Sequence, residues 1–305
     1  MAMKLSTIIV NWNTGELLDQ CLQSVAENVQ VWPGDAVETV VVDNASTDQS
    51  LERARAAHPW VDFIENDNNA GFARANNQAL ELCSGEYLLL LNPDTRVLPG
   101  ALETLVTFMD AHPEVGGCGP LLLNADGSLQ ISCHPMLTPG REFWRLSFLD
   151  RLWPRAHYPL QRWGREQVRS VEVIKGACLL LRRDALAQVG YLDGQYFMYT
   201  EEMDLCYRLL QAGWTMMWVP QAHVIHYGEV SSRQMAERMY VQLYRSKMQF
   251  HRKFGGAQRA AYFRYLLFLA YIPRWILLAL AAWIAPDYEP RARTYRQLLR
   301  ELREM

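Results

Sequence analysis

The sequence predicts an α/β protein built on a doubly wound, mostly parallel sheet, with a helical segment appended after it. Three observations support this fold class. Strand-like and helix-like segments alternate four times between residues 5 and 112, as they do in strand–helix–strand units. Clusters of polar residues follow three of the strands directly. Residues 233–305 differ from the rest, because they combine leucine and tryptophan with an excess of arginine.

Each predicted element rests on the spacing of its apolar residues. Residues 5–10 are a continuous apolar, β-branched run, which is typical of a buried parallel strand. Residues 16–28 place apolar side chains three and four positions apart, which predicts a helix. The alternation continues with a strand at 38–42, a helix at 50–57, a strand at 61–64, a helix carrying Ala79, Leu80 and Leu82, a strand at 88–91 and a helix at 100–112.

The four leucines of 88–91 predict a central strand that is buried on both faces. Pro93 cannot donate a hydrogen bond to a sheet, so the chain must leave the sheet there. Asp94 is therefore expected just beyond the carboxyl end of the strand, where open α/β sheets bind ligands. Mg²⁺ is commonly held by one or two carboxylates together with phosphate oxygens of a substrate. Asp94 taken alone is equally compatible with an ordinary turn aspartate.

Polar clusters at 11–14, 43–48 and 92–96 each follow a strand, and in a parallel sheet they share one edge. This pattern indicates a nucleotide-type site, although each cluster alone could be turn chemistry. The chain contains neither G-x-G-x-x-G nor G-x-x-x-x-G-K-[ST], which disfavours a Rossmann dehydrogenase or a P-loop enzyme.

The second half of the body is less regular. Residues 137–170 are expected to be irregular and hold seven arginines interleaved with tryptophans. The sequence further predicts a hairpin turn at 124–127, a strand at 171–181, a segment from 197 to 208 that enters a helix ending at Gly213, and a strand at 215–219.

Charge divides the chain unevenly. The whole chain carries a net charge of −3, but residues 233–305 hold 14 Lys and Arg against five Asp and Glu. We expect an anionic membrane surface as the partner of this tail, and no nucleic acid, because the tail is also rich in leucine and tryptophan. The six cysteines form no C-x-x-C pair and no signal peptide is evident, so a reducing cytoplasmic compartment is expected.

The tail contains apolar runs at 265–273 and 275–286, separated by Arg274 and expected to be kinked near Pro273. Each run is shorter than the roughly 20 residues that span a bilayer. The pattern therefore favours a pair of interfacial helices over a transmembrane segment. A packing appendage or a dimer interface is the alternative.

The chain resembles the family 2 glycosyltransferases of GT-A fold, particularly the bacterial rhamnosyltransferase and galactofuranosyltransferase-like branch. The ordered set of motifs covers about residues 5–230, so that the expected domains are 1–230 for the glycosyltransferase and 231–305 for the tail. The matching pieces are Ile8-Ile-Val-Asn-Trp-Asn-Thr14, Val41-Val-Asp-Asn-Ala-Ser-Thr-Asp48, Asn69-Ala-Gly-Phe-Ala-Arg-Ala-Asn-Asn77, Leu91-Asn-Pro-Asp-Thr95, Lys175-Gly-Ala177, Phe197–Asp204 and His226-Tyr-Gly228.

The resemblance implies a donor-binding set. Asp43 matches the aspartate that binds the pyrimidine base of the donor, and Asn11 and Trp12 are expected to pack beside that base. The family's contacts to ribose and diphosphate match Asn69, Arg74 and Asn77. A guanidinium can fork onto phosphate, as Arg74 would, although an exposed helix arginine is the alternative.

The resemblance also implies a divalent cation, Mg²⁺ or Mn²⁺. Asp94 matches the last carboxylate of the D-x-D-type motif, whose first acid is replaced by Asn92 in this chain. His226 matches a histidine that completes the metal shell in several relatives, and a structural histidine is the alternative. His223 is expected on the opposite face of an extended segment, because the two positions are an odd number of residues apart.

The match at the general base departs from the family pattern. The branch normally has Glu-Asp-x-Asp, whereas this chain reads Glu201-Glu-Met-Asp204, so Glu202 stands where the aspartate base is expected. Repulsion among Glu201, Glu202 and Asp204 could raise one pKa to a useful value. Acidic residues also favour helix N-termini, which could explain Glu201 by itself.

Together these matches imply an inverting, metal-dependent glycosyltransferase of cell-envelope polysaccharide synthesis at the inner face of the membrane. It would move a rhamnose-like sugar from a dTDP- or UDP-linked donor to a saccharide or lipid-linked saccharide. Two other classes stay open. A sugar-nucleotidyltransferase also uses aspartates at strand ends but normally has a glycine-rich, lysine-bearing loop, and a non-catalytic nucleotide-sugar-binding protein would need no base.

Overall fold

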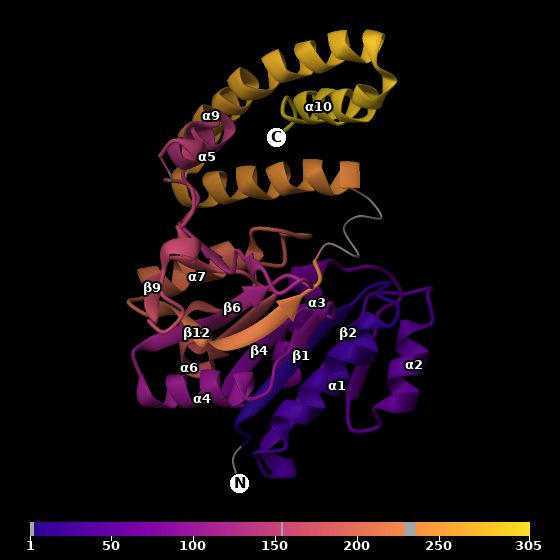
Figure 1. Ribbon diagram of the computed structural model, residues 1–305, viewed down its shortest axis with the longest axis vertical. Coiled ribbons are helices and arrows are strands. Elements are labelled where there is room, and N and C mark those ends of the chain that lie inside the picture. Colours follow the sequence, from indigo (N-terminus) through magenta and orange to yellow (C-terminus); the bar gives the residue numbers. More distant parts are fainter. Residues whose placement is uncertain (1–2, 154, 229–235) are drawn as a thin grey trace. The chain divides into compact units, whose positions relative to one another are not determined.

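The computed structural model describes residues 3–153, 155–228 and 236–305 (Figure 1). The chain divides into two compact units. The first unit comprises residues 1–136, 159–197 and 201–231, and the second comprises 137–158, 198–200 and 232–305. The second unit thus includes 137–158, which the sequence analysis had assigned to the first domain. The predicted boundary between 230 and 231 lies outside the described residues.

The first unit is built on a sheet of ten strands, eight of which follow the order β3-β2-β1-β4-β11-β6-β12-β5. The strands β3, β2, β1 and β4 run parallel, because helices connect them, whereas β11 is antiparallel to both of its neighbours. The predicted doubly wound, mostly parallel sheet is confirmed. The strands of this sheet are β1 (Leu5–Asn11), β2 (Val37–Asp43), β3 (Asp62–Glu65), β4 (Tyr87–Leu91), β5 (Thr95–Val97), β6 (Val115–Leu123), β7 (Leu129–Gln130), β9 (Arg169–Val171), β11 (Cys178–Arg182) and β12 (Thr215–His226). A separate antiparallel pair is formed by β8 (Cys133–His134) and β10 (Val173–Ile174).

The helices of the first unit cover the sheet with their apolar faces. In α1 the residues Leu18, Cys21, Leu22 and Val25 are buried at the helical spacing that predicted the helix. These helices are α1 (Leu17–Val29), α2 (Ser50–Ala57), α3 (Phe72–Leu82), α4 (Ala101–Ala111), α6 (Arg183–Val189) and α7 (Glu201–Gln211), with 3₁₀ turns η1 (Gly34–Ala36) and η3 (Leu160–Arg162).

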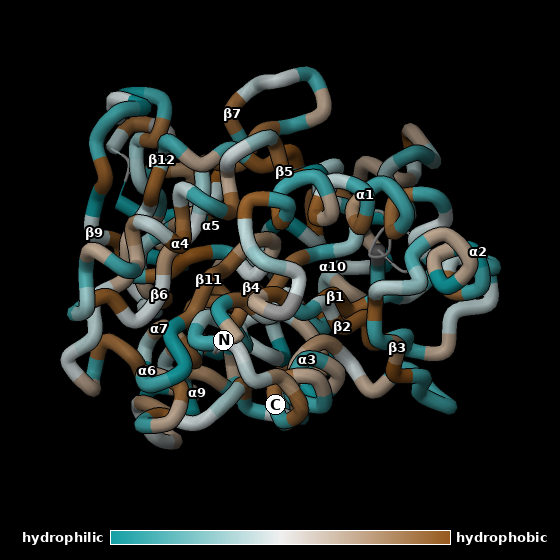
Figure 2. The backbone as a smooth tube through the Cα atoms, turned by 90° about the horizontal axis from the view of Figure 1, so that it is seen from below, coloured by the Kyte–Doolittle hydropathy of each residue, from teal (hydrophilic) through white to brown (hydrophobic). Residues whose placement is uncertain are grey.

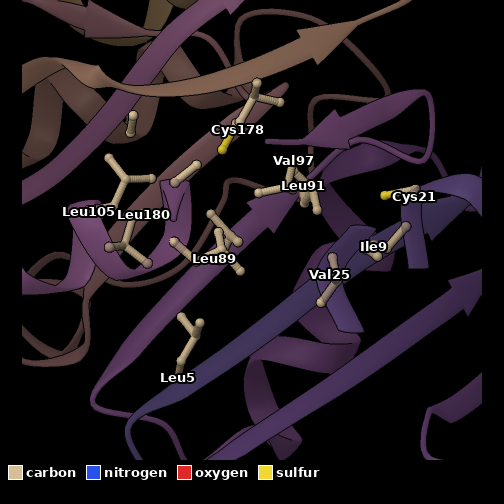
Figure 3. Close-up of a cluster of buried hydrophobic side chains, with 14 of the residues drawn as sticks. Leu5, Ile9, Cys21, Val25, Leu89, Leu91, Val97, Leu105, Cys178 and Leu180 are labelled. Atoms are coloured by element: carbon tan, nitrogen blue, oxygen red, sulfur yellow. The ribbon is translucent and has the colours of Figure 1, made fainter. Parts of the chain in front are cut away.

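The core of the first unit lies between the sheet and these helices. Figure 3 shows part of it, including Leu89 and Leu91 of β4 and Leu180 and Cys178 of β11, where Leu89 pairs with Leu180 and Leu91 with Cys178. Figure 2 shows the same strands as hydrophobic, brown segments of the chain. All five residues of β4 are buried, as the leucine run predicted. The leucine run is therefore placed near the middle of the sheet, and the polar residues after it are at the sheet edge.

Several boundaries predicted from sequence were wrong. The helix that carries Ala79, Leu80 and Leu82 begins at Phe72, so it also contains Arg74 and Asn77. The strand β5 begins inside the cluster 92–96, and β12 runs through Pro220 to His226. Pro220 is accommodated where the register between β12 and β6 shifts. The predicted turn at 124–127 is confirmed, since the amide of Asn124 bonds the carbonyl of Ser128 and Gly127 has φ of +78°.

The second unit is helical. It contains α5 (Pro139–Leu146), η2 (Leu149–Arg151), α9 (Ala236–Ile284), η4 (Pro286–Tyr288) and α10 (Glu289–Glu301). The prediction that residues 137–170 are irregular is therefore wrong for residues 139–146, which form α5. The helix α9 continues through Pro273, and its backbone leaves helical geometry at Gly256 (φ 67°, ψ −174°), a break that the sequence did not predict. Positive φ favours glycine, which explains the position of the break.

The part of α9 after Gly256 packs against α10 and the first part of α9. Phe263, Leu267 and Tyr271 of α9 are buried together with Leu298 and Leu302. Figure 1 shows α10 running back along this half of α9. Among the described residues, the segment Glu237–Ile284 is long and apolar enough to cross a membrane by length and composition, and only 11% of its most apolar window is buried.

Candidate active site

The polar clusters meet at the carboxyl edge of the sheet, as predicted. Asn11 and Asp43 are partners in the register of β1 and β2, and Ile9 pairs with Leu91 at the end of β4. The Asn11 side-chain amide donates to the Asp43 Oδ1 at 2.7 Å. Asn92 and Asp94 follow β4 directly. The strands β1, β2 and β4 therefore bring the polar residues at their carboxyl ends to one region.

Asn11 is fully buried and its side chain is engaged within the protein. Its Nδ2 also donates to the hydroxyls of Ser46 and Ser50, and its Oδ1 accepts from Thr14. The other oxygen of Asp43 accepts the amide of Ser46 at 2.8 Å. This network holds the Asp43 carboxylate in one orientation. The side chain of Asn11 is thus arranged to position Asp43, whereas Trp12, next to it, is half-buried.

Asn69, Arg74 and Asn77 lie around the start of α3. The Asn69 Oδ1 accepts the amide of Gly71, which caps the turn before the helix. A Cβ atom at position 71 would lie 2.4 Å from the carbonyl oxygen of Phe197, and the backbone at Gly71 has φ of +84°. Both features require glycine there. This close approach joins the start of α3 to the segment before α7.

Arg74 and Asn77 both reach the loop that follows α6. The Arg74 Nε donates to the carbonyl of Gly194 at 2.8 Å, and the guanidinium is otherwise exposed. The Asn77 side chain donates to the carbonyl of Leu192 and accepts its amide. Both hydrogen-bonding ends of Asn77 are therefore used to hold this loop, which differs from the direct ligand contact expected from sequence.

Asp94 and His226 lie side by side although β4 and the end of β12 are far apart in sequence. The His226 Nε2 is 3.3 Å from the Asp94 Oδ1 and 3.3 Å from the Asn92 Nδ2. Asp94 is almost completely buried, with 7% of its surface exposed. The peptide of Tyr227 donates to the carbonyl of Asp94, which fixes the end of β12 against this loop. His226 and His223 are separated by an odd number of strand positions, so they lie on opposite faces of β12.

Gln130 holds His226 and was not identified from sequence. Its Nε2 donates to the Asn124 Oδ1 and to the carbonyl of His226, so its Oε1 must be the acceptor for the His226 Nδ1 at 2.7 Å. This contact orients the imidazole ring so that its Nε2 faces Asp94. The turn Asn124–Gly127 was visible in the sequence, but the proximity of Gln130 to His226, 96 positions away, was not.

The Asp94–His226 pair suits a divalent cation whose remaining ligands come from a substrate. A carboxylate oxygen and a neutral imidazole nitrogen at this separation can occupy neighbouring positions around one ion. Within residues 3–153, 155–228 and 236–305, no cluster of three or more His, Cys, Asp and Glu side chains is arranged as a metal site. Two protein ligands are what Mg²⁺ typically uses when phosphate oxygens supply the rest.

The acidic residues of α7 have three different environments. The buried Asp204 accepts from the Arg208 Nε at 2.7 Å and from the Tyr196 hydroxyl at 3.2 Å. Glu201 is also buried, and burial together with the neighbouring Glu202 raises its pKa well above the usual range. Folding therefore favours the protonated form of Glu201. Glu202 is half-buried, so it is the most accessible of the three carboxyl groups.

Glu202 is connected to the strand edge through the segment Lys175-Gly-Ala177. The amide of Asn92 donates to the carbonyl of Ala177 at 3.0 Å. The Cβ of Glu202 lies 3.7 Å from the position that a Cβ on Gly176 would occupy. Two residues before Glu201, the backbone enters an uncommon conformation, with φ of +68° at Tyr199 and +75° at Thr200. Such positions cluster at functional sites because they cost free energy.

The match to a family model identifies this class of protein. Residues 6–190 match the glycosyl transferase family 2 model. A second finding agrees with it, because the chain is 31% identical over 238 residues to N-acetylglucosaminyl-diphospho-decaprenol L-rhamnosyltransferase of Mycobacterium tuberculosis, covering 73% of this chain and 76% of the relative. The chain is a family 2 glycosyltransferase.

Other relatives of this glycosyltransferase act in glycan synthesis. The low-salt glycan biosynthesis hexosyltransferase Agl10 of Haloferax volcanii is 27% identical over 209 residues, covering 67% of this chain and 61% of the relative. Among solved structures, the mannosyltransferase PcManGT from Pyrobaculum calidifontis, in complex with GDP-Man and Mn²⁺, has a TM-score of 0.55 at 18% identity and covers 98% of this chain and 86% of its own. GalNAc-T7 with UDP, GalNAc and Mn²⁺ has the same TM-score and covers 74% of this chain and 44% of its own. These neighbours have the GT-A fold, so the predicted fold is confirmed.

Proposed function

We propose that this glycosyltransferase is inverting and divalent-cation-dependent, and that it moves a rhamnose-like sugar from a dTDP- or UDP-linked donor to a saccharide or lipid-linked saccharide acceptor. The observation that carries the proposal is the Asp94–His226 pair, 3.3 Å apart, at the same sheet edge as Asp43. The name of the mycobacterial relative, which contains both a rhamnosyl group and a diphospho-decaprenol, supports this choice of sugar and acceptor. The pathway proposed is cell-envelope polysaccharide synthesis.

The donor's base is proposed to bind at Asp43. Asn11 and Ser46 already orient this carboxylate, so it can accept a hydrogen bond from a pyrimidine without a rearrangement. Trp12, half-buried at the end of β1, is proposed to pack beside the base. Asn69 and Asn77 hold the backbone around the start of α3 and the loop that α3 contacts. Their proposed contribution is to shape the ribose site.

The donor's diphosphate is proposed to lie between Arg74 and the Asp94–His226 pair. The Nε of Arg74 donates to the carbonyl of Gly194, and this bond orients the guanidinium. The two terminal nitrogens of Arg74 bond none of the described residues. Those nitrogens can fork onto phosphate oxygens. A Mg²⁺ or Mn²⁺ ion held by Asp94 and His226 would neutralise charge that develops on the leaving diphosphate.

Glu202 is the proposed general base. Glu201 is buried and Asp204 is both buried and paired with Arg208, whereas Glu202 is the most accessible of the three carboxyl groups. Glu202 would accept the proton of the acceptor hydroxyl as that oxygen attacks the anomeric carbon, on the face opposite the leaving nucleotide. The C–O bond to the diphosphate breaks as the new glycosidic bond forms, which inverts the anomeric centre.

The proposed location is the cytoplasmic face of the cell membrane, with the protein bound peripherally or monotopically. A lipid-linked acceptor is confined to the membrane, so an enzyme that uses one benefits from being held there. The long apolar segment Glu237–Ile284 and the basic character of residues 233–305 support this location.

The decisive experiment follows transfer of radiolabel from dTDP- and UDP-sugars to a membrane extract. Donors are first screened by thermal stabilisation, because a bound donor raises the unfolding temperature. Labelled product that extracts with lipid supports the proposal. Stabilisation by a donor with no product in any extract would indicate a non-catalytic binding protein. Release of pyrophosphate from a nucleoside triphosphate and a sugar phosphate would indicate a nucleotidyltransferase.

A further inference from the structure

The half of α9 after Gly256 exposes a stripe of large apolar side chains. Its residues recur three or four positions apart, so they share one face of the helix. The buried residues Phe263, Leu267 and Tyr271 lie on the opposite face, against α10. The exposed stripe consists of Tyr262, Tyr265, Leu269, Ile272, Ile276, Leu280 and Trp283, with Leu277 and Ile284 beside it.

A second exposed apolar group lies in the loop after α5, here called the 148–153 loop. Leu152 is 85% exposed, Trp153 is 64% exposed and Phe148 is 55% exposed. The loop is nevertheless held in place. Trp144 donates its indole N–H to the carbonyl of Trp153 at 2.8 Å, and the guanidinium of Arg155 lies 5.1 Å and 5.0 Å from these two rings. Its apolar side chains are thus fixed in an exposed arrangement.

Arg274 joins the 148–153 loop to the stripe. Its guanidinium lies over the ring of Phe148 at 5.0 Å and also bonds the carbonyl of Leu146. On α9 the same side chain bonds the carbonyl of Ala270, one helical turn earlier. The loop therefore lies beside the middle of the stripe although more than 120 residues separate them, and both belong to the second unit.

The composition of this surface matches a membrane interface. Tyr262, Tyr265 and Trp283 are exposed on the stripe, and the amphipathic rings of tyrosine and tryptophan favour the boundary between lipid and water. The surrounding segment is basic, with 14 Lys and Arg against five Asp and Glu in residues 233–305. Exposed Arg293, Arg296 and Arg300 recur along one face of α10. Apolar area and positive charge together favour an anionic lipid surface.

The packing of α10 argues against a spanning helix. By length and composition α9 could cross a membrane. However, α10 is bound along its buried face through Leu298 and Leu302, and it carries exposed arginines. Spanning would either draw these charges into the hydrocarbon or strip α10 from α9, and both are costly. A helix lying in the plane of the interface keeps α10 on the aqueous side.

We propose that the stripe and the 148–153 loop form one surface, by which the second unit lies in the plane of an anionic bilayer without crossing it. This deepens the membrane location proposed above and rests on it. The surface has two insertion elements from distant parts of the chain. It holds the second unit parallel to the membrane, where the headgroup of a lipid-linked acceptor is found.

Binding of the full chain to vesicles tests the contribution of the loop. Vesicles of phosphatidylglycerol in phosphatidylcholine are compared with phosphatidylcholine alone in a co-sedimentation assay. We expect Leu152→Glu/Trp153→Glu to weaken binding to the anionic vesicles about 10-fold or more, since two apolar side chains no longer enter the interface. Leu82→Glu, at a 70% exposed leucine of the first unit, is the matched control and should bind normally. Unchanged binding of the loop variant overturns the proposal.

Nitroxide labels test the orientation without relying on charged substitutions. Single cysteines at Leu152, Tyr265, Ile272 and Leu280 can be labelled, because all six native cysteines are buried. Residues 265 and 280 are about 22 Å apart along a helix at ~1.5 Å per residue, so a spanning helix would hold them at very different depths in a core of ~30 Å. We expect all four labels at one shallow depth in anionic vesicles. A steady change of depth along α9 overturns the proposal in favour of a spanning helix.

Two further measurements separate this surface from the proposed function. A chain that ignores vesicles and forms dimers in sedimentation would show that the surface pairs two copies, which overturns the proposal. Donor binding is measured in parallel by thermal stabilisation. Lost vesicle binding with normal donor binding defeats the surface alone, whereas vesicle binding with no donor binding or transfer defeats the proposed function alone.

Discussion

The two units differ in which side chains they expose, because the first exposes few large apolar residues and the second exposes many. Of the 19 large hydrophobic side chains that are exposed among the described residues, 14 lie in the second unit, although it is the smaller of the two. The first unit instead buries its large apolar residues and gathers polar ones at the edge of its sheet. The first unit is thus organised to bind a polar ligand, and the second to bind an apolar surface.

Both units also bury carboxylates, but with different partners. Asp94 lies 3.3 Å from the Nε2 of His226 and pairs with no lysine or arginine among the described residues, so a cation can still be added. Glu142, 4% exposed, accepts from Lys247 at 2.9 Å and from Arg145 at 2.6 Å. Its charge is already compensated. A buried carboxylate in this protein is therefore a candidate for chemistry only where the fold leaves its charge unpaired with a cationic side chain.

The largest effect is expected at Asp94. Asp94→Asn should lower the rate of transfer about 10³-fold or more, because a cation that stabilises the leaving diphosphate loses its charged ligand. The amide keeps the shape of the carboxylate, so the unfolding temperature should hardly change. Initial rates measure the loss of transfer, and the Mn²⁺ electron paramagnetic resonance signal measures the loss of metal binding. Asp184→Asn, at an exposed aspartate of α6, is the control, and a normal rate for the wild type in EDTA would contradict the metal interpretation.

Glu142 should show the opposite behaviour. Glu142→Gln leaves Lys247 and Arg145 without their buried partner, which we expect to cost about 3–5 kcal/mol of unfolding free energy. Donor binding should be unchanged. Urea denaturation measures the first effect and thermal stabilisation by the donor the second. Glu289→Gln, at an exposed glutamate paired with Arg293, should change stability by less than about 0.5 kcal/mol. Equal effects of the two substitutions would contradict the assigned role of Glu142.

The same ion cluster predicts how stability depends on pH. Burial alone would raise the pKa of Glu142, but Lys247 and Arg145 outweigh burial and lower the pKa to about 2. A carboxyl group whose pKa is lowered by folding stabilises the fold above its unfolded pKa and loses this contribution as the pH falls towards its folded pKa. The unfolding free energy should therefore decrease from about pH 4.5 towards pH 2. The decrease should be shallower in Glu142→Gln, and equal slopes in urea titrations would argue against this cause.

Glu202 is expected to have the next largest effect on chemistry. Glu202→Gln should lower kcat about 10²-fold while leaving donor affinity nearly unchanged, because only proton transfer is lost. Glu202→Asp should retain activity. Glu201→Gln should change kcat little, since Glu201 is buried and less accessible than Glu202, and Asp204→Asn should lower stability by releasing Arg208 and Tyr196. A crippling effect of Glu201→Gln on kcat would mean that the base is misassigned.

The smallest effect is expected at Gln130, which touches His226 rather than the substrate. Gln130→Ala should weaken Mn²⁺ binding about 10-fold, because it removes the hydrogen bond that fixes the His226 ring and its tautomer. At saturating Mn²⁺ the value of kcat should be close to that of the wild type. Titration followed by electron paramagnetic resonance measures the affinity. Gln211→Ala, at an exposed glutamine of α7, is the control. An unchanged Mn²⁺ affinity in Gln130→Ala would mean that Gln130 does not position His226 for the metal.

The sequence alone determined the first half of the sheet and its functional edge. Continuous apolar runs such as 88–91 bury on both faces whatever surrounds them, and the connecting helices force neighbouring strands to run parallel. From these two facts it follows that the residues after β1, β2 and β4 share one edge. The motif resemblance supplied Asp43, Asp94 and His226, and the fold brings Asp94 and His226 together.

Tertiary structure decided which side chains at that edge are free to act. Asn11 and Asn77 match ligand-binding positions, yet their side chains are used inside the protein by partners that no local pattern reveals. Gln130 is placed on His226 by the pairing of β7 with β6, and the 148–153 loop is placed on α9 by Arg274. Helical and strand periods report only which face of an element is apolar. Contacts between residues about 100 positions apart depend on how many elements pack at once, so only the folded chain decides them.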